Sequence, residues 1–432
     1  MVKTKGVDKL YILITIVVII ITILITLYPL ESYYVYIRNR ILQGAPIESS
    51  GKMIKSHFSN RILKDNRRKF SDKQKINNGN IEEGFATFTR CKSRKLTKNL
   101  EYTFQKGNIH RVGSEGSNWD IYLPCGYNNV ESELETINIS NQNQKIFGIK
   151  GCDFIVSKNS LWHLLQKKFG RQQASTIMPE TYILSNEDDM QVFKQNYSPD
   201  KLYLLKKNIQ RKKGIQITHD YNVIMKAKAD NYKVVQEYVP DLYLINNRKI
   251  NLRIYLLITC HKGVIKGYLH KQGKCIYTNK EYGGNMKNIN SSVIDPEEHL
   301  TSLNLDIAIY NNNPESFEDL KKHMGFFNYY TLDKNIQYSM KKVMEAAEGS
   351  ICKSKKLDNN VSFQLFGADV IFTKNLHPYI LELNKGPQMG YKTGKDEKMK
   401  KKVTYDIFSL VGLVPKETNM IGKNKNGFYQ IW

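Results

Sequence analysis

Short apolar runs separated by polar turns dominate the chain after residue 180 and predict alternating strands and helices. The predicted strands are 202–207 (LYLLKK), 214–218 (GIQIT), 233–239 (KVVQEYV), 250–260 (INLRIYLLITC) and 264–270 (VIKGYLH). The last two runs are expected to pair with each other. Helices are predicted at 158–170, where leucines recur on one face, at 337–349, and near 396–411. Residues 86–140 contain further strand-like runs. Together these elements predict an α+β or α/β fold with an antiparallel sheet.

The most informative stretch is the closing hairpin predicted at 363–384. Asp369 lies in its first apolar run, and the second run ends in Glu382 and Asn384. Residues two apart in a strand point to the same face, so Glu382 and Asn384 share a face and the hairpin can bring Asp369 beside them. Three oxygen-bearing side chains in this arrangement suit Mg²⁺. The alternative is an ordinary half-buried hairpin with solvated acids at its edge.

The N-terminal part has a different character. The run 10–28 carries no charge and is long enough to span a hydrocarbon core of about 30 Å, which predicts an uncleaved single-pass signal anchor. A cleaved signal peptide is the alternative. Residues 32–85 are polar and basic and are expected to form a tether. The predicted segments are an anchor at 1–31, the tether at 32–85, a first part of the folded domain at 86–180, its central and C-terminal lobes at 181–415, and a tail at 416–432.

The membrane topology predicted from charge stays open. Lysines precede the apolar run, and Arg38 and Arg40 follow it, so the positive-inside rule leans toward a cytosolic N-terminus. The order of cations and acids described below indicates a chemistry that needs ATP, which favours a cytosolic domain instead. The prediction is therefore a membrane protein spanning the bilayer once through 10–28, with the side of the domain uncertain and the cytosol favoured.

The net charge of the chain is +24, from 65 Lys and Arg against 41 Asp and Glu. Such a charge favours an acidic partner, whether nucleic acid, anionic lipid or an acidic polypeptide. The six cysteines are scattered singly with no C-x-x-C pair, so neither a zinc site nor a disulfide framework is predicted. A reducing compartment fits this pattern best.

Basic residues precede the acidic hairpin in a consistent order. Lys158 begins a helix, and Lys206 ends a strand before a basic loop that contains Arg211 and Gly214. Lys249, Asn251 and Arg253 then share one face of the next strand. Taken singly, each cation is expected to be an ordinary solvated side chain. In order, they place cations for phosphate ahead of a divalent-metal site, which favours phosphoryl transfer.

The chain contains no G-x-S-x-G, H-E-x-x-H or Walker A motif, and its histidines show no metal-ligand spacing. An ATP-driven ligase needs no nucleophile from the protein. In such an enzyme ATP phosphorylates a carboxylate and an amine attacks the acylphosphate, while the enzyme supplies Mg²⁺, cations and alignment.

Several motifs in the same order resemble the tubulin-tyrosine-ligase family, a branch of the ATP-grasp fold. The resemblance runs from about Trp119 to Leu413. It rests on Trp119-Asp120-Ile121-Tyr122, on Lys206 followed by RKKGI, on VVQEYVPDLYLINNRKINLRIYLLIT, and on FQLFGADVIFTKNLHPYILELNKGP, which ends in the family's E-x-N-x-x-P pattern.

The resemblance implies a role for each matching residue. Asp369, Glu382 and Asn384 would hold Mg²⁺, with Glu382 and Arg253 as the catalytic pair and Arg253 facing the acceptor's carboxylates. The residues implied for ATP are Lys158, Lys206, Arg211, Gly214, Gln236, Glu237, Tyr238, Val239 and Lys249, of which 236–239 would form the adenine hinge.

Four positions depart from the family pattern. Lys207 replaces a proline, Lys212 replaces a glycine of the phosphate loop, and Asn251 replaces an aspartate. Ile276 stands where the family often has an arginine, and Lys274 could replace that cation only if the strand register shifts. The nucleotide half of the site is thus expected to be intact and the acceptor half altered.

The leading hypothesis is a membrane-tethered ATP- and Mg²⁺-dependent ligase that joins a free amino acid to a carboxylate of an acidic protein acceptor, with a tubulin tail as the family's usual acceptor. One alternative keeps the ligase but changes the acceptor. Another is an inactive scaffold that binds microtubules or an acidic protein at a membrane. A nucleic-acid binder ranks lower, because basic residues are spread along the chain and no RNA- or DNA-binding signature occurs.

Overall fold

The computed structural model describes residues 86–88, 96–112, 118–126, 128, 130–208, 214–283, 295–301, 305–418 and 425–432. They all belong to one compact unit, which spans Ile81–Trp432. The segments predicted as an anchor (1–31) and a tether (32–85) lie outside the described residues. The boundaries predicted within the folded part remain predictions.

The predicted membrane localisation requires correction. Within the described ranges, no helix is both long enough and apolar enough to cross a bilayer. The run 10–28, on which the prediction rested, lies outside those ranges. A membrane-spanning helix is therefore not retained as part of the fold.

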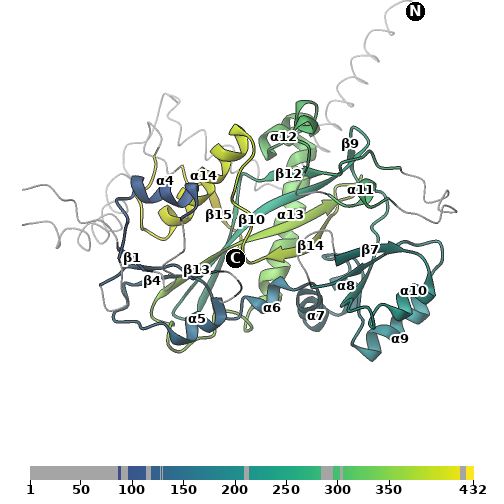
Figure 1. Ribbon diagram of the computed structural model, residues 1–432, viewed down its shortest axis with the longest axis horizontal. Helices are drawn as coiled ribbons and strands as arrows, with labels where there is room; N and C mark the ends of the chain where they lie inside the picture. The colour runs from purple at the N-terminus through teal and green to yellow at the C-terminus, as the bar shows by residue number, and fades with distance from the viewer. Residues whose placement is uncertain are drawn as a thin grey trace, which may run out of the picture. The chain divides into compact units, whose positions relative to one another are not determined.

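A large sheet of 11 strands forms the centre of the unit (Figure 1). Its main order is β15 (Phe428–Gln430), β11 (Val264–His270), β10 (Arg248–His261), β13 (Val361–Phe372), β4 (Lys145–Phe147), β3 (Ile121–Tyr122), β1 (Ala86–Phe88) and β2 (His110–Arg111). Three further strands branch from this path: β9 (Leu244–Ile245) and β12 (Lys274–Tyr277) pair with β10, and β14 (Pro378–Asn384) pairs with β13. The strand β10 runs antiparallel to both β11 and β13, and β13 runs antiparallel to β14, as the hairpin patterns predict.

Both faces of the long strand β10 are buried. Ile254, Leu256 and Ile258 join one apolar core, together with Leu332 and Ile336 of α13 (Phe326–Ala347). The alternate residues Tyr255 and Leu257 join a second core beneath α4 (Lys98–Lys106) and α14 (Gly394–Leu410). This alternation explains why the sequence of β10 reads as a nearly continuous apolar run.

A second, four-stranded antiparallel sheet has the order β5 (Thr181–Ile183), β8 (Val234–Glu237), β6 (Tyr203–Lys206) and β7 (Ile215–Thr218). One face packs on α9 (Glu187–Asn196) and α10 (Tyr221–Lys226) through an apolar cluster that includes Phe193 and Ile224. On the other face, Leu204 clusters with Ile371 of the large sheet. The two sheets thus meet, and this mixed α+β architecture is consistent with the predicted ATP-grasp class.

The remaining helices are α5 (Val130–Thr136), α6 (Asp153–Val156), α7 (Lys158–Phe169), α8 (Arg171–Ala174), α11 (Pro296–His299), η4 (Ile307–Asn311) and α12 (Phe317–Met324). The segment 86–140 contains the strands β1, β2 and β3, in line with the strand-like runs expected there, and also α4 and α5, which were not predicted. The helix predicted at 337–349 spans Phe326–Ala347, so it begins earlier than predicted.

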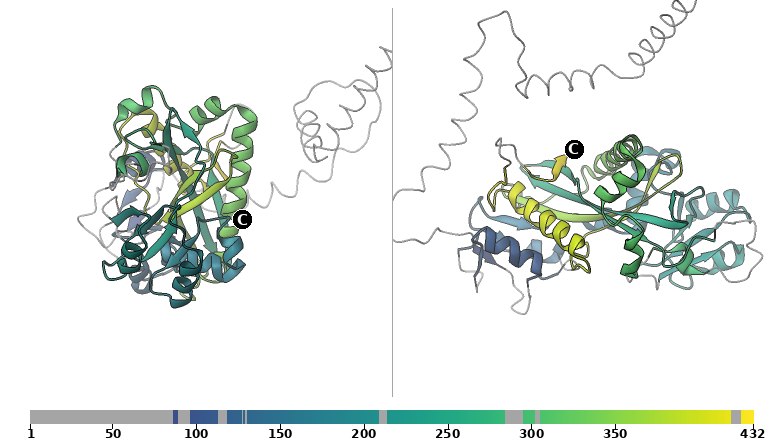
Figure 2. Two further views of the ribbon diagram at one scale, coloured as in Figure 1. Left: turned by 90° about the vertical axis from the view of Figure 1, so that its right-hand side faces the viewer. Right: turned by 90° about the horizontal axis from the view of Figure 1, so that it is seen from above.

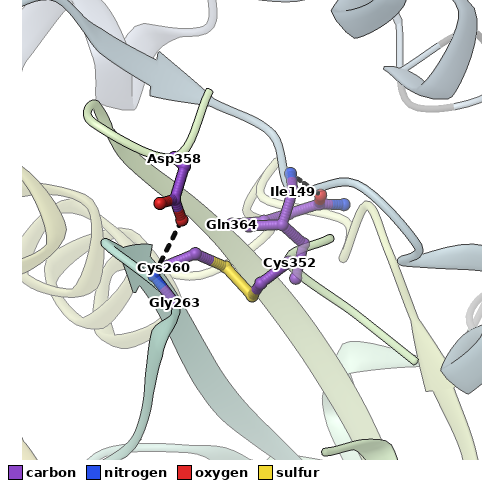
Figure 3. The surroundings of a disulfide bond; sticks show 6 residues. All are labelled: Ile149, Cys260, Gly263, Cys352, Asp358 and Gln364. Carbon is purple, nitrogen blue, oxygen red and sulfur yellow. Dashed lines mark hydrogen bonds between the residues drawn. A yellow bond between two sulfur atoms is a disulfide. The ribbon is translucent and has the colours of Figure 1, made fainter. Parts of the chain in front are cut away.

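A disulfide joins Cys260, at the end of β10, to Cys352, which follows α13 (Figure 3). Beside it, Asp358 Oδ1 accepts a hydrogen bond from the Gly263 amide at 2.8 Å, and Gln364 Oε1 accepts one from the Ile149 amide at 3.0 Å. The prediction that the cysteines form no disulfides is therefore wrong. Spacing along the chain did not reveal the pair, because its two partners are 92 residues apart.

Removing this disulfide should lower stability. Closing a loop of 92 residues restricts the unfolded chain, so we expect Cys352→Ser to lower the free energy of unfolding by about 2–4 kcal/mol. Urea denaturation without reductant measures the difference. Reductant should lower the stability of the wild type more than that of the variant, which already lacks this disulfide. Superimposable curves for the two oxidised proteins would contradict the prediction.

Candidate active site

Three charged side chains form a row across the middle of the large sheet. Arg253 on β10 lies directly opposite Asp369 on β13, and Asp369 lies opposite Glu382 on β14. Asn384 follows two residues after Glu382 and faces Gly367. The hairpin thus brings together the three residues predicted to hold a metal. Their convergence follows from strand register, because residues opposite each other in a sheet point to the same face.

Direct contacts link the row. The Arg253 guanidinium donates to both carboxylate oxygens of Asp369, at 2.6 Å from Nε and 3.2 Å from Nη2. Lys158 Nζ lies 2.9 Å from Glu382 Oε2. Asn384 Nδ2 donates to Glu382 Oε1 at 3.2 Å and to Asp369 Oδ2 at 3.5 Å. Each carboxylate therefore has one cation and the same amide as neighbours.

The pKa values of the two carboxyl groups are shifted in opposite directions. Burial and the neighbouring Glu382 charge raise the pKa of Asp369, although Arg253 opposes the shift. Burial also opposes ionisation of Glu382, but the ammonium groups of Lys158 and Lys206 outweigh it and lower the pKa of that carboxyl. At neutral pH Glu382 thus holds a negative charge within a cluster of cations.

Gly367 gives Arg253 its room. A Cβ atom at this position would lie 3.1 Å from Arg253 Cδ and 2.8 Å from Pro387 Cβ. Any larger residue would therefore displace the guanidinium that contacts Asp369. The sequence pattern did not reveal this role of Gly367, although the residue lies two positions before Asp369 in the same motif.

Lys206 is buried at the end of β6 and donates to the side-chain oxygen of Gln236 on β8. Gln236 Nε2 in turn donates to Thr181 Oγ1 at 2.8 Å. The side chain of Gln236, which was predicted to belong to the adenine hinge, thus positions a lysine. Burial and the nearby Lys158 charge lower the pKa of Lys206 to about 8.

Lys249 is a second buried lysine. Its ammonium lies over the ring of Tyr238, 4.7 Å from the centroid. Burial and the Lys206 charge lower the pKa of Lys249 to about 7. Lys158, Lys206 and Lys249 come from α7, β6 and β10, and their mutual repulsion marks a place where an anion would be stabilised.

The predicted hinge residues border a cavity of about 450 Å³. Glu237, Tyr238 and Val239 line it, together with Pro179 and Tyr379. The three lysines are not among its lining residues. The Glu237 side chain points away from them, since its carboxylate lies 2.9 Å from Lys201 Nζ. A nucleotide at the hinge would therefore have its phosphates beyond this cavity, toward the lysines.

The predicted phosphate loop is only partly described. Arg211 lies within 209–213, outside the described residues. Gly214 is buried, and its carbonyl accepts a hydrogen bond from the Lys207 amide at 2.8 Å, which closes the loop at its base.

A buried polar network beside Arg253 was missed. Lys274 lies opposite Arg253 in the β10–β12 register, and Ile276 lies opposite Asn251. Lys274 Nζ is 2.8 Å from Asp396 Oδ2, which also accepts from Lys400 Nζ at 3.1 Å. No shift of register is needed for Lys274 to lie on the face of Arg253. The only sequence signal for this network was the spacing of Asp396 and Lys400, one helical turn apart.

Mg²⁺ fits the donor set of the row. Two adjacent buried carboxylates need positive charge nearby, and their oxygens with the Asn384 amide are ligands that this hard cation prefers. Among the described residues, no three His, Cys, Asp or Glu side chains converge as a metal site. A metal held by two carboxylates and an amide would keep positions for water and phosphate, as Mg²⁺ commonly does.

Comparison with known proteins agrees with this architecture. The model of the tubulin-tyrosine ligase family matches residues 137–420, and the chain belongs to this family. It is 25% identical over 293 residues to tubulin monoglutamylase TTLL4 of Mus musculus, covering 63% of this chain and 24% of the relative. It is 24% identical over 297 residues to the probable tubulin polyglutamylase ttll-9 of Caenorhabditis elegans, covering 65% of this chain and 68% of the relative.

A third relative, a probable beta-tubulin polyglutamylase of Tetrahymena thermophila, is 26% identical over 310 residues. The match covers 64% of this chain and 25% of that protein. The chain thus spans about a quarter of the length of two of these relatives.

Proposed function

We propose that this protein is an ATP- and Mg²⁺-dependent ligase that joins a free amino acid to a carboxylate of an acidic protein tail. The observation that carries the proposal is the row of Arg253, Asp369 and Glu382 beside the half-buried Lys158 and the buried Lys206 and Lys249. The triphosphate group of ATP is an anion that such a cluster of cations would stabilise.

In the proposed reaction, a carboxylate oxygen of the acceptor forms a bond to the γ-phosphorus as the bond to ADP breaks. The amine of the incoming amino acid then attacks the acyl carbon, phosphate leaves, and the amine proton passes to solvent. Asp369, Glu382 and Asn384 would hold Mg²⁺, which would neutralise charge on the phosphates.

The residues of this chain would act mainly by alignment and charge. Lys158, Lys206 and Lys249 would bind the phosphates, and Arg253 would orient the acceptor carboxylate. The hinge from Gln236 to Val239 would bind adenine through its backbone. Arg211 and Gly214 would border the phosphates from the loop. Such positioning is the main source of catalysis in phosphoryl transfer.

The proposed acceptor is tubulin and the proposed amino acid is glutamate. The names of the relatives support both choices, and a positively charged enzyme suits an acidic tail.

The inactive-scaffold alternative rests on Asn251 and Ile276. Asn251 Oδ1 is buried without a hydrogen-bond partner among the described residues, and apolar Ile276 lies opposite it. The neighbouring Lys274, however, supplies a cation opposite Arg253, which favours the ligase.

The test is to incubate the full chain with tubulin, Mg²⁺-ATP and glutamate and to measure intact tubulin masses. The proposal expects increments of glutamate residues that require ATP. Mixed amino acids in a parallel reaction would reveal a different donor. If no acceptor gains mass and Mg²⁺-ATP does not raise the melting temperature, the ligase proposal fails and the scaffold remains.

Nucleotide affinity should depend on pH. With pKa values of about 7 for Lys249 and about 8 for Lys206, both ammonium groups lose their protons as the pH rises through this range. Phosphates bind the charged forms, so we expect the affinity for a non-hydrolysable ATP analogue to fall between pH 6.5 and 9, with proton uptake on binding.

Calorimetry in buffers of different ionisation enthalpy measures that uptake. Protonation of the nucleotide itself contributes equally to the wild type and the variants. Lys249→Met should therefore remove only the part of the pH dependence of affinity that is centred near pH 7. Proton uptake that is the same in the variant and the wild type would contradict the assignment.

A further inference from the structure

Large apolar side chains are exposed mainly on one helix. The described residues of this type with high exposure are Phe154, Val264, Ile307, Phe326, Phe327, Tyr330 and Tyr338, and the last four belong to α13. Their exposed fractions on α13 run from 51% for Tyr330 to 71% for Phe327. Such a concentration of exposed aromatic rings is typical of an interaction surface.

The exposed rings follow the helical period. Phe327, Tyr330, Lys334, Tyr338 and Lys341 lie three or four residues apart, so they form one stripe along α13. The opposite side of the helix is buried against the core. In both views of Figure 2, α13 runs along the outside of the folded unit. We call this stripe, with Phe326 and the adjacent Lys321 of α12, the α13 outer face.

Lysines accompany the rings on this face. Lys321 Nζ lies 5.2 Å from the centroid of Phe326, and Lys334 Nζ lies 5.4 Å from that of Tyr330. Neither ammonium belongs to an ion pair between described residues, whereas Lys342 pairs with Glu345 at 2.8 Å. Their positive charge is therefore available to a partner.

The nearby acids are already occupied. Glu318 lies 3.3 Å from Lys322, and Asp319 pairs with Lys395. Asp333 is half-buried and accepts hydrogen bonds from Gln337 and Tyr429. The α13 outer face thus presents aromatic rings with an excess of positive charge.

We propose that the α13 outer face docks an acidic polypeptide. Carboxylates of the partner would pair with Lys321 and Lys334, and its apolar side chains would cover Phe327 and Tyr330. Burying exposed aromatic area stabilises a complex. Pairing of the lysines beside the rings with carboxylates of the partner gives the complex specificity.

Charge complementarity separates this partner from others. A second copy of this chain, at +24, would repel the same face, and the segment 32–85 of this chain is itself basic. A nucleic acid would require a denser track of cations than this face provides. The inference does not depend on ligase chemistry, although an acidic acceptor would suit the same face.

The test uses the full chain without ATP and two fluorescent polymers, poly-L-glutamate and a glutamate–tyrosine copolymer. Two double variants remove one component each: Phe327→Ser with Tyr330→Ser, and Lys321→Glu with Lys334→Glu. Matched controls are Phe154→Ser and the pair Lys226→Glu with Lys228→Glu, exposed elsewhere on the molecule. Circular dichroism and melting temperature confirm that each variant folds.

Both face variants should bind the copolymer about tenfold or more weakly, while the controls change little. Loss of the rings should reduce affinity for the copolymer more than for poly-L-glutamate. The inference is overturned if either face variant binds the copolymer like its control. It is also overturned if single-stranded DNA or anionic vesicles show the same variant dependence with tighter binding. Because binding is measured without turnover, a failed ligation assay leaves this result interpretable.

Discussion

Glu382→Gln is expected to reduce ligation by at least about 10²–10³-fold while the protein stays folded. The substitution keeps the shape of the side chain but removes the charge that lies 2.9 Å from Lys158 Nζ. It also removes half of the carboxylate pair that would hold Mg²⁺. Tubulin mass increments under Mg²⁺-ATP provide the measurement, with near-wild-type melting as the test of folding.

A matched control is Glu135→Gln. Glu135 is an exposed glutamate of α5 that pairs with Lys150, outside the row, and its substitution should leave the mass increments unchanged. If Glu382→Gln turned over as fast as the wild type, the Glu382 carboxylate would have no role in the mechanism. Loss of turnover together with a lower melting temperature would instead indicate a structural role for the Glu382 charge. In that case Glu382→Asp, which keeps the charge, should restore the melting temperature.

The hairpin that carries the site was predictable because its information is local. Apolar runs on each side of a short polar turn predict the two strands, and the turn limits their register. Counted from the turn, that register would place Asp369 opposite Leu381. A β-bulge between Asp369 and Val370, which the sequence did not reveal, brings Asp369 opposite Glu382. The pairing of β10 with β11 was predictable from similarly local information.

Other parts of the site depend on contacts between distant segments. Lys274, Asp396 and Lys400 come together only when β12 and α14 pack near Arg253, and no local pattern specifies that packing. Two cysteines far apart in sequence become partners for a similar reason. The role of Gln236 as a support for Lys206 likewise requires knowing that β6 and β8 are neighbours.

The start of α13 illustrates a limit of a different kind. Its first turns, FFNYY, contain aromatic residues that favour strands, and all but Tyr329 are exposed. Strand propensity therefore points away from a helix here. The feature that hid the helix from sequence analysis is the one that makes its outer face a candidate docking surface.

Arg253→Met should produce a large loss of stability, of about 3–5 kcal/mol in the free energy of unfolding at neutral pH. Its guanidinium and the Asp369 carboxylate are both nearly buried, with 11% and 12% of their side chains exposed. Removing the cation leaves Asp369 buried beside Glu382 with no compensating charge from β10. Lys201→Met, at an exposed pair, is the control and should cost no more than about 1 kcal/mol.

Two features distinguish a lost charge pair from lost packing. In the double variant Arg253→Met with Asp369→Asn, the losses should not add, and the coupling should be about 1–3 kcal/mol.

The pH dependence of the free energy of unfolding provides the second feature. Without Arg253, the pKa of Asp369 rises further above its unfolded value, so the folded state binds the extra proton. Stability of the single variant should therefore recover as the pH falls through that raised pKa, and the double variant should lack this recovery. Additive losses that do not change with pH would show that Arg253 acts on the fold through its packing alone.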